Sequence, residues 1–320
     1  MSVGCEIGQP RLRARLQAPL SPQAVPANRL GSASGGDISG QKMGAMAALL
    51  PDGRLHLQHG PIDIVAQGWG DPAVLRAGYA RAAARFSTIL QELVPELPAL
   101  RAEGQPVSGV VAGRMAAAVA PFRPAFITPM AAVAGAVAEE VLAALLGPGI
   151  RRAQVNNGGD IALWLAPGES LRCALAVSGG MDHVTVWAGM PVRGIATSGW
   201  RGRSFSLGIA DAVTVLARTA AMADAAATMI ANAVDLPGHP GIRRRPAHEL
   251  QLESDLGARL VTVAVPDLSR QDRQAALAAG LAAAEGFRAR GLIEGAAIYL
   301  QGRRRLTGGL ALTAAEGGNE

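Results

Sequence analysis

Val155-Asn156-Asn157-Gly158-Gly159-Asp160-Ile161 is a turn sequence set between two apolar segments of β type. Asn and Gly tolerate positive φ, and Asn-Gly is a strong hairpin signal, here between strands predicted over 152–156 and 160–165. A tight turn of this kind can also present backbone N–H groups to an anion, and Asp160 directly follows the two glycines. The residues alone leave two interpretations open, a plain hairpin turn and an anion-binding turn.

Further strands and helices are predicted on both sides of this turn. Asp71-Pro72 is typical of an N-cap followed by proline at the first helical position, and apolar residues then recur at helical spacing. Helices are predicted over 73–95, 109–120, 129–146, 219–234 and 269–290. Further strands are predicted in a hairpin over 46–67 and over 171–177, 184–188, 206–217, 259–265 and 293–301. The sequence therefore predicts an α+β fold with a mixed, largely antiparallel sheet core flanked by helices.

The ends of the chain differ from its centre in composition. Residues 1–42 are rich in Gly, Ser, Pro and Gln and follow neither the helical nor the strand period, which predicts a flexible leader. Residues 309–320 are predicted to form a frayed tail. Residues 43–308 contain no internal repeat and no linker, so we expect a single domain there.

The overall composition narrows the class of protein. With 49% hydrophobic and 17% charged residues, the chain is expected to fold, and no apolar run reaches the roughly 20 residues of a membrane helix. No secretory signal is recognised and the two cysteines lie in different contexts, so we expect a cytoplasmic protein with two reduced thiols. A net charge of +5 with only 3% aromatic residues does not favour nucleic-acid binding. Lys42 is the one lysine, and a chain so rich in arginine suits bidentate recognition of phosphate or carboxylate.

A second polar stretch reads Ala196-Thr197-Ser198-Gly199-Trp200-Arg201-Gly202-Arg203-Ser204. Hydroxyl and guanidinium donors gathered in a loop between strands suit a phosphate group. The alternative is a solvated surface loop whose arginines extend into water.

A third stretch, Ala223-Asp224-Ala225-Ala226-Ala227-Thr228, lies in the helix predicted over 219–234. Asp224 and Thr228 are four residues apart, so their oxygens project from one helical face, and the alanines leave room for a ligand. Mg²⁺ takes one or two carboxylates and completes its shell with water, backbone or phosphate oxygens, which this pair permits. The alternative is an exposed aspartate beside a threonine that bonds to its own helix.

Taken in this order, the three stretches resemble the ApbE-like superfamily, whose best-known members are Mg²⁺-dependent FAD:protein FMN transferases. The superfamily's Val-Asn-x-Gly-Gly-Asp-Ile, Ala-Thr-Ser-Gly and Ala-Asp-Ala-x-Ala-Thr runs are similar to residues 155–161, 196–199 and 223–228. Residues 52–63 and 127–135 resemble its uncharacterised bacterial and archaeal branch. The resemblance covers about residues 43–308 and implies a single ApbE-like domain.

The resemblance also implies roles for individual residues. Asp224 and Thr228 would bind Mg²⁺, and the Thr197-Ser198-Gly199 loop would line the flavin nucleotide. The other predicted cofactor-binding residues are Asn156, Asn157, Gly158, Gly159, Asp160 and Thr128. Arg201 or Arg203 would stabilise charge on a leaving group, so Asp224, Arg201 and Arg203 are the predicted catalytic residues.

Two features of the transferases are missing. Their helix corresponding to 129–146 usually carries a Gly-x-Ala-Lys-Gly run, but no lysine follows Lys42 in this chain. A His-x-x-Asp-Pro type of run normally follows the Thr-Ser-Gly loop, where this chain has Ser206-Leu207-Gly208-Ile209-Ala210-Asp211. Flavin binding can therefore persist without flavinyl transfer to a protein threonine.

The function implied is that of a Mg²⁺-dependent protein that binds FAD or FMN, as a transferase-like enzyme or a maturation factor. The alternative is a non-catalytic carrier of a flavin or another phosphorylated metabolite. The expected partners are that small molecule, an acceptor protein in the case of a transferase, and a second copy of the chain in a homodimer. Neither nucleic acid nor a membrane is expected as a partner.

Overall fold

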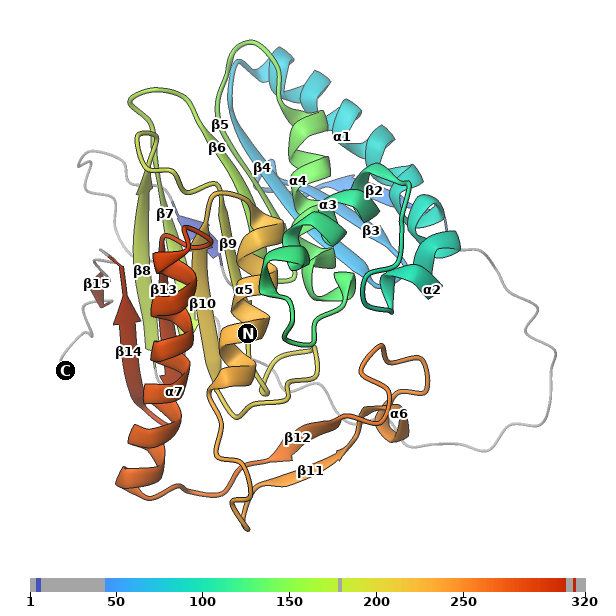
Figure 1. Cartoon of the computed structure of the whole chain (residues 1–320). Coiled ribbons are helices and arrows are strands. Elements are labelled where there is room, and N and C mark those ends of the chain that lie inside the picture. Colours follow the sequence, from blue (N-terminus) through green and yellow to red (C-terminus); the bar gives the residue numbers. More distant parts are fainter. Residues whose placement is uncertain (1–3, 7–43, 178–179, 309–312, 315–320) are drawn as a thin grey trace, which may run out of the picture.

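Residues 4–6, 44–177, 180–308 and 313–314 are described by the structure, a computed structural model of the chain. Within these residues the centre is a nine-stranded sheet of order β14-β13-β10-β9-β6-β5-β4-β3-β2, whose neighbouring strands all pair antiparallel (Figure 1). Its strands are β2 (Met46–Leu49), β3 (Leu55–His59), β4 (Ile62–Gly70), β5 (Ile150–Asn157), β6 (Asp160–Leu165), β9 (Gly194–Ser198), β10 (Ala212–Ala217), β13 (Gly295–Leu300) and β14 (Arg303–Thr307). The predicted α+β fold is confirmed.

Helices cover one face of this sheet (Figure 1). The helices that contact the strands are α1 (Pro72–Leu93), α4 (Val133–Leu145), α5 (Ala220–Ala233) and α7 (Arg270–Ala289). The shorter helical segments are η1 (Val94–Glu96), α2 (Leu97–Leu100), α3 (Val110–Val119), η2 (Ala120–Phe122) and η3 (Pro129–Ala132). The main hydrophobic core lies between these helices and the sheet.

Helix α1 shows how local sequence sets this layer. The Asp71 side chain accepts hydrogen bonds from the backbone N–H groups of Ala73 and Val74 at 2.8 and 3.3 Å, and Pro72 occupies the first turn. A stripe of buried side chains then faces the sheet: Tyr79, Ala82, Phe86, Ile89 and Leu93. The N-cap and the helix predicted from Asp71-Pro72 are both confirmed.

A second sheet, of order β1-β7-β8-β15, adjoins the other face of the large sheet. Its strands are β1 (Gly4–Glu6), β7 (Ser170–Val177), β8 (Gly180–Trp187) and β15 (Thr313–Ala314). Side chains of β6 alternate between the two cores, because Ala162 packs with the helices whereas Ile161 and Leu163 pack against Leu171 and Val184. The large sheet is therefore buried on both faces at β6.

An arm, defined as residues 243–264, extends from the body of the protein (Figure 1). It consists of β11 (Arg243–Pro246), α6 (Ala247–Leu250) and β12 (Leu260–Ala264), and β11 pairs antiparallel with β12. The three consecutive arginines 243–245 lie in β11. The arm contacts the body through an ion pair between Glu253 and Arg101 at 2.7 Å and a hydrogen bond between Asp255 and Thr128.

Most predicted elements are confirmed within a few residues. The strand predicted over 206–217 begins only at Ala212, and β9 was assigned to a loop. The hairpin predicted over 46–67 is three strands, since the chain turns again at Gly60. Strand β9 gains its hydrogen-bond partners from β6 and β10, and local periodicity does not reveal such pairing.

The prediction of two reduced thiols is wrong for Cys173, which is disulfide-bonded and fully buried. The backbone register of β1 and β7 places Cys5 opposite Cys173. Apart from residues 4–6, the predicted leader over 1–42 lies outside the described residues. No helix in the described part of the chain is long and apolar enough to cross a membrane, and the cytoplasmic location stays a prediction.

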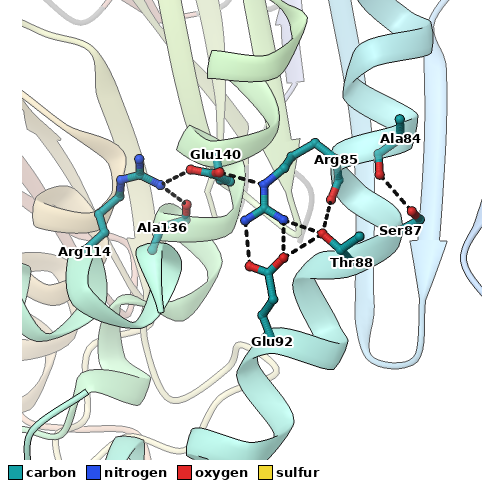
Figure 2. Close-up of polar contacts among 8 residues, drawn as sticks. All are labelled: Ala84, Arg85, Ser87, Thr88, Glu92, Arg114, Ala136 and Glu140. Atoms are coloured by element: carbon teal, nitrogen blue, oxygen red, sulfur yellow. Dashed lines mark hydrogen bonds and ion pairs between the residues drawn. The ribbon is translucent and has the colours of Figure 1, made fainter. Parts of the chain in front are cut away.

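An ion-pair network fixes the helices of one half of this layer (Figure 2). The Arg85 guanidinium on α1 pairs with Glu92 at 2.6 Å and with Glu140 on α4 at 2.7 Å. Arg114 on α3 pairs with the same Glu140 at 2.9 Å and with Glu139 at 3.0 Å. Burial alone would raise the pKa of Glu140, but the two guanidinium groups outweigh burial and lower the pKa below its usual 4.5.

Replacing Glu140 with alanine is expected to lower the free energy of unfolding by about 2 kcal/mol at pH 7, because two guanidinium groups lose a half-buried partner. The exposed Arg245–Glu249 pair, at 3.1 Å, offers a matched control, and Glu249→Ala is expected to change stability by less than about 0.5 kcal/mol. Since the Glu140 pKa is lowered in the folded protein, its contribution is present at neutral pH and lost as the pH falls through that pKa. Urea unfolding at pH 7 and pH 3 measures both effects, and equal losses for the two variants at pH 7 would contradict the role of the network.

Candidate functional site

A cavity of about 830 Å³ lies at the end of the large sheet where β5 turns into β6 and where β9 ends. Helices α1, α4 and α5 contribute to its wall, and Gln251 of the arm lines it as well. The three polar stretches found in the sequence all reach this cavity, through Asn156, Asn157, Gly158, Gly159, Asp160, Thr197, Ser198, Gly199, Arg201, Arg203, Asp224 and Thr228. The fold thus brings together every predicted site residue except Thr128.

The β5–β6 turn forms one wall of the cavity. Gly158 and Gly159 have φ values of +67° and +119°, which residues with a side chain rarely adopt, and the Gly159 N–H donates to Asn156 Oδ1 at 2.8 Å. A Cβ atom on Gly158 would lie 1.8 Å from Nη2 of Arg203, so the guanidinium group rests directly on the turn. The turn is therefore a hairpin turn, as predicted, and it also faces a cavity beside a cationic group.

Two carboxylates, Asp160 and Asp224, face the same cavity. Burial raises the pKa of Asp160 to about 7, although the Thr197 backbone N–H, at 3.2 Å from Oδ1, and the charge of Arg203 oppose the shift. Burial also raises the pKa of Asp224 well above its usual value, and the negative charge of Asp160 adds to this shift. The two carboxyl groups therefore repel each other when both are ionised.

Helix α4 approaches α5 closely beside Asp224. A Cβ atom on Gly135 would lie 2.3 Å from the Ala220 carbonyl oxygen, so only glycine permits this contact. The Gly135 N–H donates to Asp224 Oδ2 at 3.0 Å, and Asn157 Nδ2 donates to the Ala134 carbonyl at 3.1 Å. The beginning of α4 therefore holds both Asp224 and the β5–β6 turn in place.

The donor set suits a hard divalent cation. Asp160, Asp224 and the Thr228 hydroxyl line one cavity, and no described basic side chain forms a salt bridge with Asp224. A cation between the carboxylates would remove their repulsion, and Mg²⁺ completes its shell with water and substrate phosphate oxygens. Among the described residues there is no cluster of three or more His, Cys, Asp or Glu side chains of the kind that holds a metal without a substrate.

The two predicted arginines have different surroundings. Arg201 Nε donates to the buried Asp211 carboxylate at 2.6 Å. The guanidinium carbon of Arg201 lies over the Trp200 ring, 4.8 Å from the ring centroid. Asp211 is held in turn by the Gln301 backbone N–H at 2.5 Å, so Arg201 is fixed on one edge while its Nη atoms make no described hydrogen bond. Arg203 forms no salt bridge with a described carboxylate, although its charge acts on the nearby Asp160.

Two of the predicted cofactor-binding hydroxyl groups are engaged elsewhere. The Thr197 hydroxyl lies 2.9 Å from that of Thr214, so Thr197 contributes its backbone N–H to Asp160 rather than its hydroxyl to the cavity. Thr128 does not line the cavity. It is buried, and its hydroxyl donates to Asp255 of the arm.

Sequence reasoning did not find a second group of lining residues. Asp63, Arg101 and Gln251 add polar atoms to the cavity, and Asp63 is exposed. Most of the others are apolar side chains, which come from β4 as well as from α1, η1, α2, α3, η3 and α4. Helical periodicity marks such residues as core, and nothing in the sequence separates a residue that faces a cavity from one that faces a packed interior.

The raised pKa of Asp160 predicts that Asp160→Asn stabilises the metal-free protein by about 1–2 kcal/mol at pH 8. The folded protein favours the protonated form of Asp160. The stability that this protonation contributes is complete below pH 3.8, declines as the pH rises and is lost above about pH 7. Asparagine is neutral and keeps an oxygen that can accept from the Thr197 N–H. Thermal unfolding of Asp160→Asn and the wild type in EDTA, at pH 8 and at pH 5, measures this difference in stability. A variant that is no more stable than the wild type at pH 8, or that gains equal stability at both pH values, would contradict the prediction.

Comparisons with known proteins identify the family of the chain. A family model described as AbpE bacteria matches residues 47–306. UPF0280 proteins of Methanothermobacter thermautotrophicus and Methanopyrus kandleri are 39% and 40% identical over 121 and 142 residues, which is 36% and 43% of this chain and 46% and 53% of those proteins. The chain thus spans about half the length of the curated relatives it matches.

Among solved structures, a variant of the flavin transferase ApbE from Vibrio cholerae is similar with a TM-score of 0.39 and 14% identity, over 85% of this chain and 97% of that chain. The family of the chain is shown instead by the family model, which covers most of the described residues. On that match, the chain belongs to the ApbE-like family described as AbpE bacteria.

Proposed function

We propose that this protein binds a flavin nucleotide, FAD or FMN, in the cavity together with Mg²⁺. The observation that carries the proposal is the convergence of the glycine turn, the two arginines and the carboxylate pair on one cavity of about 830 Å³. The choice of a flavin rests on the resemblance of the three stretches to the ApbE-like superfamily.

The polar half of the cavity, defined as its part lined by the three stretches, offers suitable partners for a nucleotide. Arg203 above Gly158 and the free Nη atoms of Arg201 provide cationic donors for phosphate oxygens. Ser198 and Asn156 also line this half and carry groups that can pair with the polar edge of a flavin ring.

The residues would act mainly by positioning and by electrostatics. Asp224 and Asp160, with Thr228, would hold the metal, whose charge would neutralise phosphate oxygens when it is bound. Arg201, oriented by Asp211 on one edge and Trp200 on one face, would keep its donors directed at a phosphate group. Arg203 would stabilise negative charge that develops on a leaving phosphate.

A comparison of FMN with riboflavin tests the proposal directly, because the two differ only in the phosphate group. We expect FMN to bind at least about 100-fold more tightly in Mg²⁺, since charge-assisted bonds to arginine dominate recognition. Quenching of flavin fluorescence measures both affinities, and equal affinity for the two compounds would contradict a phosphate site.

A non-catalytic carrier is the second candidate, and a specific observation favours it. None of the described residues that line the cavity is a lysine, histidine, cysteine or tyrosine, so only carboxylates are available for proton transfer there. Incubation with FAD and Mg²⁺ separates the candidates. An enzyme would release AMP together with an FMN product, whereas a carrier would return intact FAD.

A further inference from the structure

The cavity has a second half that the proposed flavin site leaves unused. This apolar half is lined by aliphatic side chains from the end of α1, from α2 and α3, and from the beginning of α4. Its main members are Leu93, Leu97, Leu100, Met115, Val133 and Val137. Leu100, Met115 and Val137 are fully buried, so they form the packed back wall of this half.

The apolar half provides no hydrogen-bonding partner along its walls. The side chains of its main members end in carbon or thioether sulfur, and the backbone groups of Met115 and Val137 lie within regular helix. Arg101, paired with Glu253 of the arm, and Gln251 are polar and partly or fully exposed, which places them at the mouth. A polar ring edge placed inside would lose its bonds to water without replacement.

A hydrocarbon chain suits these walls better than a ring system. No aromatic side chain is among the described residues that line the cavity, so nothing there can stack on a flat ring. Met115 and Met130 adapt to the shape of a flexible chain. Burial of each methylene group is favourable and needs no directional partner.

The two halves are continuous along the beginning of α4. Val133 faces the apolar half, and the next two residues contact the polar half, since the Ala134 carbonyl accepts from Asn157 and the Gly135 N–H donates to Asp224. A phosphate group at Arg203 and Gly158 could therefore carry a chain that passes α4 into the apolar half. We infer that the cavity takes alkyl or isoprenyl phosphates, with the phosphate in the polar half and the hydrocarbon chain in the apolar half. This inference rests on the proposed function only for the phosphate-binding end.

The experiment titrates the full chain, in Mg²⁺ and below micelle-forming concentrations, with n-alkyl monophosphates of four to ten carbon atoms. We expect affinity to rise about three-fold for each added methylene until the apolar half is filled, and we expect FMN to compete. Leu97→Gln places a polar group in the apolar half and should flatten this chain-length dependence. Leu49→Gln is the matched control, because Leu49 is 61% exposed on β2, away from the cavity, and should leave the dependence unchanged.

The outcomes separate this inference from the proposed function. Affinity for the alkyl phosphates that does not change with chain length would overturn the inference, whether or not FMN binds. A chain-length dependence that is unchanged in Leu97→Gln would overturn it as well. Chain-length dependence without any binding of FMN or FAD would support the inference and overturn the proposed flavin function. Thermal unfolding of both variants shows whether each retains the fold, and if Leu97→Gln unfolds, Val94→Gln at the exposed rim replaces it.

Discussion

Asp224→Asn is expected to abolish Mg²⁺-dependent binding of FAD and FMN, with a loss of affinity of about 100-fold or more. The Asp224 carboxylate faces the cavity, is close enough to Asp160 for their charges to repel, and has no cationic partner among the described residues. Asparagine keeps an oxygen for the Gly135 N–H but removes the negative charge that a divalent cation needs. Titration of each nucleotide at several Mg²⁺ concentrations measures the loss.

A matched control is available at Asp267, an exposed aspartate that does not line the cavity. Asp267→Asn removes the same charge from the chain and is expected to bind the nucleotides like the wild type. Equal affinity of Asp224→Asn and the wild type, in Mg²⁺ as well as in EDTA, would remove Asp224 from the metal site.

Gly135→Ala is expected to lower the free energy of unfolding by about 2–4 kcal/mol. The added Cβ would lie 2.3 Å from the Ala220 carbonyl oxygen and 2.7 Å from the Ala221 nitrogen, and backbone atoms cannot move aside as a flexible side chain can. Helices α4 and α5 would have to separate, and the Gly135 N–H would leave Asp224. Denaturant unfolding and nucleotide binding are therefore both expected to weaken.

Gly113→Ala makes the same substitution inside another helix and is expected to have the opposite sign. Gly113 lies in α3, is exposed, and a Cβ there would meet nothing within 4 Å. Alanine is the better helix former, so this variant should gain up to about 1 kcal/mol. If both variants shift stability in the same direction, the close approach of α4 and α5 does not require glycine.

The sequence predicted the fold where local chemistry decides the conformation. Asp71 with Pro72 fixed the start of α1, and the glycine turn after Asn157 fixed the β5–β6 hairpin. It did not predict β9, because residues Gly194–Ser198 acquire strand geometry only by pairing with β6 and β10. The disulfide of Cys173 was missed for the same reason, since the pairing of β1 with β7 is a contact between distant parts of the chain.

The candidate site was predictable in its polar half and not in its apolar half. Glycine, asparagine and arginine gathered in turns are unusual enough to mark Gly158 and Arg203 in the sequence. Leu100 and Met115, in contrast, follow the helical spacing that any core residue follows. The role of Asp211 in holding Arg201 depends on a contact with β13 through Gln301, which no local pattern contains.

The most direct test of the account is a titration of the full chain with FAD, first in Mg²⁺ and then with an excess of EDTA, preceded by the absorbance spectrum of the purified protein. We expect saturable binding of one FAD per chain in Mg²⁺ that is lost in EDTA and restored when Mg²⁺ is added back. Absence of saturable binding, or binding of the same strength in EDTA, would contradict a site in which Mg²⁺ and a flavin nucleotide bind together.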